Sequence, residues 1–211
     1  MKRFLYFHIP MLILLFSQVV YSQKPQFFNL AQLLKENKLI TFDVVALNDS
    51  QKQGVSCNNG IFYLKDVTFS NGIIEVDLKG KDTCFLGIAF HGMDTTTYES
   101  VYFRPFNFQT KDTLRKNHAI QYVSYPQYPW ERLRQEHPLM YEKAAPSLFP
   151  GEWFHVCIII QDDWITVYLN HSQEETLKIK KLSNRNNGML GLWEFGQNTG
   201  DFANLMITKN E

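Results

Sequence analysis

The sequence predicts an all-β protein, a two-sheet antiparallel β-sandwich with a short N-terminal helix. Roughly eleven segments have the length of strands and are rich in β-branched and aromatic residues. Several of them alternate between apolar and polar residues, which is typical of strands with one buried face. Turn-forming residues separate the segments, and no internal repeat is present. This combination favours two packed sheets.

The length and charge of the chain indicate one globular domain that does not bind nucleic acid. The 211 residues are 45% hydrophobic and 15% aromatic, which is enough to build one full core. The chain has 21 basic and 21 acidic residues, so removal of Lys2 and Arg3 leaves 19 basic against 21 acidic, a net charge of −2. Such a balance lacks the basic excess of nucleic-acid-binding proteins.

Residues 1–22 have the pattern of a secretory signal peptide. Lys2 and Arg3 precede the apolar run IPMLILLFSQVV, and small-residue cleavage is expected after Ser22. The run is shorter than the roughly 20 residues that span a bilayer, and no later segment resembles a span. We therefore expect a secreted or periplasmic protein without a membrane span, with no cysteine near the cleavage site to carry a lipid anchor. The expected division is a signal peptide at 1–22, a lead-in with the short helix at 23–40, and the domain at 41–211.

Three cysteines, Cys57, Cys84 and Cys157, show no paired metal-ligand spacing, and their odd number leaves at least one outside any intramolecular disulfide. Cys84 and Cys157 lie in apolar strand patterns and are expected to be small buried side chains. A disulfide between Cys57 and Cys84 stays open as an alternative.

The elements follow one another with short connections. Residues 28–38 predict the helix, with Asn29 as its N-cap. Ser70, Asn71 and Gly72 predict a tight hairpin, and residues 161–163 a second turn. The expected strands are residues 42–47, 61–69, 73–78, 85–91, 99–106, 119–125, 153–160, 164–170, 177–180, 189–195 and 202–208.

An insertion at residues 125–151 interrupts the strand pattern. It contains five prolines, and residues 130–136 (WERLRQE) can form about two helical turns. Such a long insertion either has a function or covers a sheet edge. Trp130 within it either stacks on a ligand or fills a gap.

Period-two alternation separates a core face from a polar face in the central strands. Leu86, Ile88, Val101 and Phe103 are expected in the core, and the opposite face carries small and polar residues. On that face Gly87, Ala89 and His91 describe a shallow channel, next to Ser100, Tyr102 and Arg104.

The segments FSNGIIEVDLKG, FLGIAFHG, YESVYFRPF, GEWFHVCIIIQDDWITVYLN and GMLGLWEFGQNTGDFANLMI occur in an order that resembles the concanavalin A-like lectin/glucanase superfamily. More narrowly, the chain resembles secreted bacterial proteins related to laminin-G-like and 3-keto-disaccharide hydrolase-type domains. The resemblance covers about residues 61–208. It implies a jelly roll whose concave sheet holds a carbohydrate or related ligand.

The resemblance, together with the strand pattern, points to a set of ligand-binding residues. These are His91, where an Arg is common in the family, and Tyr102, Arg104 and Gln121, with Trp130 from the insertion. Candidates for catalysis are Glu99 or His91 as general base or acid and Arg104 as a stabiliser of negative charge. The alternative for Arg104 is an ion pair with Glu99.

The two-carboxylate route of retaining glycosidases is not expected. The superfamily's laminarinase-type members carry a Glu-x-Asp-x-x-Glu strand, whereas here Glu75 and Asp77 are followed by Gly80. We therefore expect a carbohydrate-binding domain first, a saccharide-degrading hydrolase or lyase as the alternative, and a protein-binding domain with exposed aromatics at 125–130 as a third reading.

No metal or other cofactor is expected apart from an optional structural Ca²⁺. No histidine pair has zinc-ligand spacing. Asp94, or Asn198 with Asp201, could contribute oxygen ligands to calcium, although turns favour these residues in any case.

Overall fold

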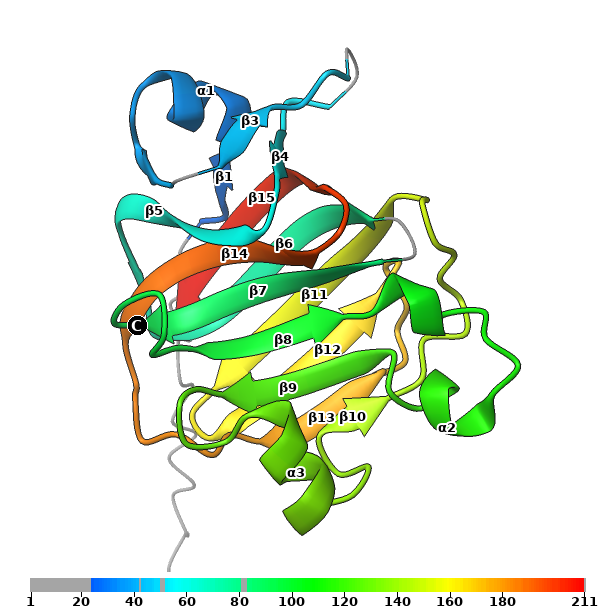
Figure 1. The fold of residues 1–211 in the computed structure, drawn as a ribbon. Helices are drawn as coiled ribbons and strands as arrows, with labels where there is room; N and C mark the ends of the chain where they lie inside the picture. The colour runs from blue at the N-terminus through cyan, green and yellow to red at the C-terminus, as the bar shows by residue number, and fades with distance from the viewer. Residues whose placement is uncertain (1–23, 42, 50–51, 81–82, 211) are drawn as a thin grey trace, which may run out of the picture.

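A computed structural model describes residues 24–41, 43–49, 52–80 and 83–210, and the expected signal peptide lies outside them. Two antiparallel sheets face each other, and the short helices lie at their edges (Figure 1). The predicted two-sheet β-sandwich is therefore confirmed. No helix among the described residues is both long and apolar enough to cross a membrane.

Sheet A has the strand order β13-β12-β11-β6-β15-β4-β3, and β1 also pairs with β15. Its strands are β1 (Gln26–Phe28), β3 (Val44–Ala46), β4 (Val55–Cys57), β6 (Asn71–Gly80), β11 (Phe154–Gln161), β12 (Trp164–Leu169), β13 (Leu177–Lys180) and β15 (Gly200–Asn210).

Sheet B has the order β10-β9-β8-β7-β14-β5-β2. Its strands are β2 (Leu39–Ile40), β5 (Gly60–Phe69), β7 (Cys84–Gly92), β8 (Glu99–Phe103), β9 (Ile120–Ser124), β10 (Glu142–Lys143) and β14 (Gly188–Gly196). The helices are α1 (Leu30–Lys35), α2 (Thr113–Lys116) and α3 (Trp130–Glu136), with a 3-10 turn at Pro105–Asn107.

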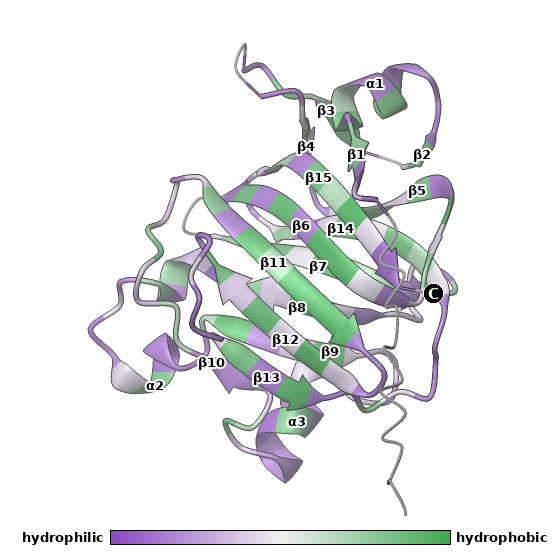
Figure 2. Ribbon diagram, turned by 180° about the vertical axis from the view of Figure 1, so that it is seen from behind, coloured by the Kyte–Doolittle hydropathy of each residue, from purple (hydrophilic) through white to green (hydrophobic). Residues whose placement is uncertain are grey.

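The core lies between the two sheets and follows the period-two pattern of the strands. Figure 2 shows hydrophobic and hydrophilic residues alternating along β6, where every second residue is buried. The side chains expected in the core from sheet B are all fully buried, namely Leu86, Ile88, Val101 and Phe103. The Phe103 ring meets the ring of Phe154 from sheet A at 5.2 Å between centroids, so these residues point toward the opposite sheet.

The predicted hairpin at Ser70 to Gly72 is wrong. β5 ends at Phe69 and β6 begins at Asn71, but β5 belongs to sheet B and β6 to sheet A. The chain therefore crosses from one sheet to the other at Ser70. Turn chemistry predicted a reversal of direction, whereas the pairing partners of both strands come from distant parts of the sequence.

The second turn and both helices lie where they were predicted, but the strand expected at 99–106 ends at Phe103 and gives way to the 3-10 turn. The hairpin of β11 and β12 pairs in register from Val156 to Gln161. Helix α1 is shorter than expected, but Asn29 caps it by accepting a hydrogen bond from Gln32 N at 3.0 Å. Helix α3 spans the expected residues 130–136.

The insertion at 125–151 extends one edge of sheet B. Within it, β10 pairs with β9, which would otherwise be the edge strand, and α3 packs beside β9 (Figure 1). The edge-covering role considered for the insertion is therefore present.

The cysteines behave as packed side chains. Cys57 and Cys84 are buried and are not bonded to each other, while Cys157 is partly buried. Cys57 donates its thiol to Gly60 O at 3.4 Å, and burial raises the pKa of this thiol to about 11. At neutral pH it is therefore a protonated, unreactive group.

Candidate functional site

One row of residues crosses the outer face of sheet B, the face that points away from sheet A. The strand register places Trp193 beside Gly87, and Gly87 beside Tyr102. Along the same row Tyr102 lies beside Gln121, which lies beside Glu142. Neighbouring strands thus hold aromatic, amide and carboxylate groups together on one rigid surface.

Gly87 makes room in this row for the indole of Trp193. A Cβ atom at residue 87 would overlap the indole ring. Trp193 Nε1 donates to Ser100 Oγ at 2.9 Å, and the indole centroid lies 5.2 Å from that of the Tyr102 ring. Both rings are almost fully buried, so this part of the outer face is filled by aromatic side chains and is not an open trough.

Gly87→Ala is expected to displace the Trp193 indole and to lower the free energy of unfolding by about 2 to 3 kcal/mol. The reason is overpacking together with loss of the hydrogen bond to Ser100. Urea unfolding followed by tryptophan fluorescence measures the effect. Gly60→Ala is the matched control, because a Cβ at residue 60 meets no atom within 4 Å. Equal stability of the two variants would contradict the assigned role of Gly87.

His91 does not share the outer face, and the expectation that it joins Tyr102 and Arg104 in one hollow is wrong. The register of β7 against β14 shifts between Ala89 and Gly92. His91 has a left-handed backbone with φ of 50°. A bulge of one residue reverses the face on which the next side chain lies. His91 therefore turns into the core, where it is fully buried.

His91 belongs to a buried polar network. Its Nδ1 lies 2.8 Å from Glu99 Oε1, and its Nε2 lies 2.8 Å from Ser70 O. Because a carbonyl only accepts, Nε2 carries a hydrogen. Tyr122 donates its hydroxyl to Glu99 and accepts from Leu182 N at 3.1 Å. His91 and Glu99, both considered for catalysis, thus have their polar atoms paired inside the core.

Arg104 is the centre of a second, outer network. Its Nη1 donates to His118 O at 2.7 Å. Its Nη2 donates to the Tyr102 hydroxyl and to Gln121 Oε1, the latter at 3.2 Å. Burial lowers the pKa of Arg104 and raises that of Tyr102, yet the guanidinium keeps its charge because its ordinary pKa is so high. The fold therefore fixes a buried cation at the end of β8.

Glu142, and not Glu99, is the carboxylate partner of Arg104. The Arg104 Nη1 to Glu142 Oε1 distance is 3.4 Å. Arg134 binds the same carboxylate with Nε and Nη2, at 2.9 and 2.8 Å from Oε1. His118 Nδ1 lies 2.6 Å from Oε2, and burial lowers the pKa of this imidazole. One buried carboxylate thus holds two guanidinium groups.

A pocket of about 290 Å³ opens beside these groups, and we call it the arginine pocket. It lies near the lower end of the usual size range of ligand sites, about 300 to 1,000 Å³, which suits one small ligand or the end of a chain. The Cζ atom of Arg134 lies 4.6 Å from the centroid of the Trp130 ring, and this indole is 36% exposed. The described lining residues are Phe85, Arg104, Phe106, Asn107, Arg115, His118, Trp130 and Arg134.

The structure brings together four of the five residues predicted to bind the ligand. Arg104 and Trp130 line the arginine pocket, whereas Tyr102 and Gln121 lie behind it and hold the Arg104 guanidinium. Tyr102 and Gln121 are therefore positioning residues, and His91 belongs to the core.

Several residues of the site were not predicted. Phe85 and Phe106 form an edge-to-face pair with 5.2 Å between ring centroids. Arg134 and Glu142 come from the insertion, and Arg115 from α2. For Arg134 and Glu142 the only sequence signal was the insertion itself, because their position beside Arg104 depends on the pairing of β10 with β9.

The carboxylates named in the sequence analysis lie elsewhere. Glu75 and Asp77 belong to sheet A, where His155 Nδ1 lies 2.8 Å from Asp77 Oδ1. Asp94 accepts from Thr96 N at 2.7 Å within its own turn. Asp201 accepts from Ser56 Oγ at 2.6 Å, and Asn198 donates to Thr83. Within the described part of the chain, no group of three or more His, Cys, Asp or Glu is arranged to hold a metal ion.

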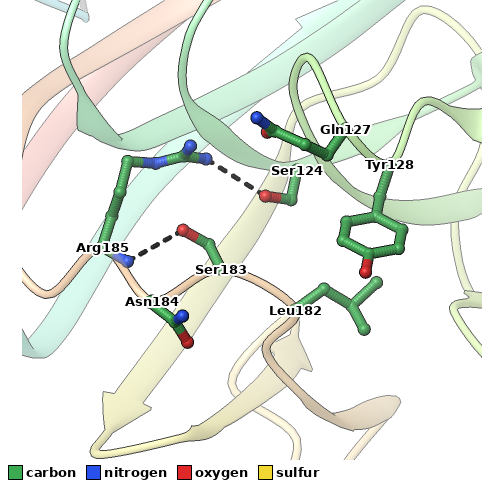
Figure 3. Close-up of a pocket in the computed structure, with 7 residues that line it drawn as sticks. All are labelled: Ser124, Gln127, Tyr128, Leu182, Ser183, Asn184 and Arg185. Atoms are coloured by element: carbon green, nitrogen blue, oxygen red, sulfur yellow. Dashed lines mark hydrogen bonds between the residues drawn. The ribbon is translucent and has the colours of Figure 1, made fainter.

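A second pocket, of about 410 Å³, lies between the start of the insertion and the segment after β13 (Figure 3). Its described walls are Ser124, Gln127, Tyr128, Leu182, Ser183, Asn184 and Arg185. Arg185 Nη2 donates to Ser124 Oγ at 3.1 Å, and Arg185 N donates to Ser183 Oγ at 2.9 Å. This pocket has one charged wall residue and one aromatic ring, so it offers fewer charged and aromatic groups than the arginine pocket.

Comparisons with known proteins address the fold. The sequence matches no protein-family model, and a search of curated proteins finds no match. Among solved structures, a carbohydrate-binding module, CBM66 from Bacillus subtilis, is 14% identical with a TM-score of 0.57, over 81% of this chain and 95% of the module. A putative glycosyl hydrolase from Parabacteroides distasonis ATCC 8503 is 13% identical with a TM-score of 0.56, over 87% of this chain and 98% of that one.

A third solved structure is a Bacillus subtilis protein of unknown function with a galectin-like fold. It is 8% identical with a TM-score of 0.58, over 90% of this chain and 97% of that one. At such identities the likeness concerns the arrangement of the strands. The chain therefore has a jelly-roll β-sandwich fold like that of these solved structures.

Proposed function

We propose that this protein binds a carbohydrate and that the arginine pocket is the binding site. The observation that carries the proposal is the meeting of aromatic rings, among them the partly exposed Trp130 indole, with arginine side chains held by hydrogen bonds at one small pocket beside sheet B. Sugars present apolar C–H faces together with hydroxyl oxygens, so aromatic walls and converging donors suit them. The carbohydrate-binding module among the structural neighbours supports the same ligand class.

Trp130 provides the clearest contact surface. Its indole is partly exposed at the pocket, and Arg134 fixes one of its faces by a cation–π contact. Arg104 is fixed by Tyr102 and Gln121, so its position requires no ordering when a ligand binds.

Binding is favoured over hydrolysis by the composition of the pocket. None of its described lining residues is Asp or Glu. The nearest carboxylate, Glu142, is buried and bound by Arg104 and Arg134. Glycosidases of the common two-carboxylate types need an acid and a second carboxylate on either side of the scissile bond. The saccharide-degrading enzyme is therefore the second candidate.

Residues 1–22 support a further part of the proposal, namely that the protein is exported. The carbohydrate would then be an extracellular or periplasmic saccharide. The basic residues and the apolar run of this segment are the basis for this inference.

Trp130→Ala is expected to weaken glycan binding by about 2 kcal/mol, or roughly thirty-fold in Kd, because it removes an aromatic wall of the pocket. A glycan array with the chain from residue 23 onward identifies a ligand, and titration calorimetry measures the change. Mass spectrometry of the same mixtures shows whether any sugar is cleaved.

Trp164→Ala is the matched control. Trp164 is 50% exposed, but it lies on β12 of sheet A. Trp164→Ala should therefore leave the Kd for the glycan unchanged. Arg185→Gln controls for the second pocket in the same way. Loss of binding in either control with full binding in Trp130→Ala would place the ligand elsewhere.

A further inference from the structure

The arginine pocket has an excess of positive charge. Arg104, Arg115 and Arg134 line it together with His118. Glu142 is the carboxylate that forms ion pairs with Arg104 and Arg134. Three guanidinium charges therefore face one carboxylate charge, while the protein as a whole has a formal net charge of zero. The local excess is a property of this pocket.

The excess is not explained by the needs of the fold. A single buried arginine beside Glu142 would form a neutral pair, and a second guanidinium on the same carboxylate adds repulsion between like charges. Indeed Arg134 lies close enough to lower the pKa of Arg104, although burial is the larger cause. Stability alone would favour fewer cations here.

Arg115 is the most available of the three. It extends from α2, is exposed, and donates Nε to Asn107 Oδ1 at 3.3 Å. No ion pair joins it to a carboxylate among the residues that the structure describes. Its terminal nitrogens can therefore bind a ligand oxyanion without first breaking an ion pair, which keeps the cost of binding low.

We propose that the arginine pocket selects an anionic sugar, one that carries a carboxylate or a sulfate group. This inference rests on the proposed carbohydrate binding and names its ligand class. Arginine is the side chain best suited to such groups, because its planar fork donates two parallel hydrogen bonds to an oxyanion. The rings of Trp130 and Phe85 would contact the apolar face of the sugar, and Arg115 would bind its charged group.

The test compares acidic oligosaccharides with their neutral counterparts. The probes are an oligogalacturonide and its methyl ester, and a κ-carrageenan oligosaccharide, whose only charged groups are sulfates, and its desulfated form. Titration calorimetry is run on the chain from residue 23 onward. In at least one pair, we expect the wild-type protein to bind the acidic member with a Kd at least about ten-fold lower than that of the neutral member. This preference should diminish as salt is raised from about 0.05 to 0.5 M.

Arg115→Gln should remove most of that preference and leave binding of the neutral counterpart within about two-fold, while Arg115→Lys should keep part of it. The matched control is Arg132→Gln, since Arg132 is an exposed arginine of α3 that pairs with Glu136 outside the pocket. It should behave as the wild type.

The possible results separate the two proposals. Equal affinity for acidic and neutral members overturns the anionic ligand and leaves carbohydrate binding in place. A preference that survives in Arg115→Gln overturns the role of Arg115. Failure of every probe, and of a wider array of neutral glycans, overturns both proposals. The two probe pairs also distinguish a carboxylate from a sulfate.

Discussion

Glu99→Ala is expected to lower the free energy of unfolding by about 3 to 5 kcal/mol, because it leaves His91 and Tyr122 without their shared partner inside the core. A domain of this size has a stability of about 5 to 15 kcal/mol, so this loss is a large fraction of the total. Glu99 and His91 are both fully buried, and water cannot replace the lost hydrogen bonds. Guanidinium chloride unfolding followed by circular dichroism measures the change.

Glu99→Gln is the matched variant, and it should cost far less. The amide can accept from Tyr122 and donate to His91 Nδ1, while His91 Nε2 still donates to Ser70 O. This variant should also bind glycan like the wild type, since the network lies between the sheets. Equal destabilisation by Glu99→Ala and Glu99→Gln would contradict the hydrogen-bond explanation. Loss of glycan binding in Glu99→Gln would indicate that Glu99 contributes to the binding site after all.

Glu194→Gln is expected to reduce the pH dependence of stability. Glu194 is fully buried, Oε2 accepts from Asn59 N at 2.7 Å, and Oε1 has no hydrogen-bond partner among the described residues. Burial raises its pKa from 4.5 to about 7. Between these two values the unfolded chain ionises and the folded protein does not, so stability falls as pH rises from about 4.5 to 7.

The size of this effect follows from the shift. One pKa unit corresponds to about 1.4 kcal/mol, so ionisation of Glu194 lowers stability by up to about 3 kcal/mol above pH 7. Urea unfolding of wild type and Glu194→Gln at pH 4 and pH 8 isolates the contribution, because the other titrating groups cancel in the difference. Glu152→Gln, on an exposed side chain, controls for the loss of one negative charge. Parallel pH profiles for the wild type and Glu194→Gln would contradict the assignment.

The strands and the core face could be predicted from the sequence because both depend on local alternation. Val101 and Phe103 are buried as the pattern requires. The pattern failed at His91, where one bulged residue changes the phase of the alternation. It failed again at Ser70, where the sequence predicts a turn but the sheet to which each strand belongs is set by partners far away.

The site could be predicted only in part for a similar reason. Tyr102 and Arg104 lie on one strand, and their common face follows from the period of that strand. The partner of Arg104 is Glu142, which lies 38 residues later in a two-residue strand of the insertion. No local pattern connects these positions. The space beside Gly87 is likewise occupied by the indole of Trp193, a residue of β14 that lies more than a hundred positions later in the sequence.

The position of β15 in sheet A has a consequence for the order in which the protein folds. β15 ends at Asn210 and lies between β6 and β4, with β1 also paired to it. Sheet A therefore cannot close until β15 has been synthesised, and until then β6 has an unpaired edge that can associate with other chains. Strands that lie far apart in the sequence, such as β6 and β15, pair slowly. Assembly of sheet A is therefore expected to be a late step in the folding of this domain.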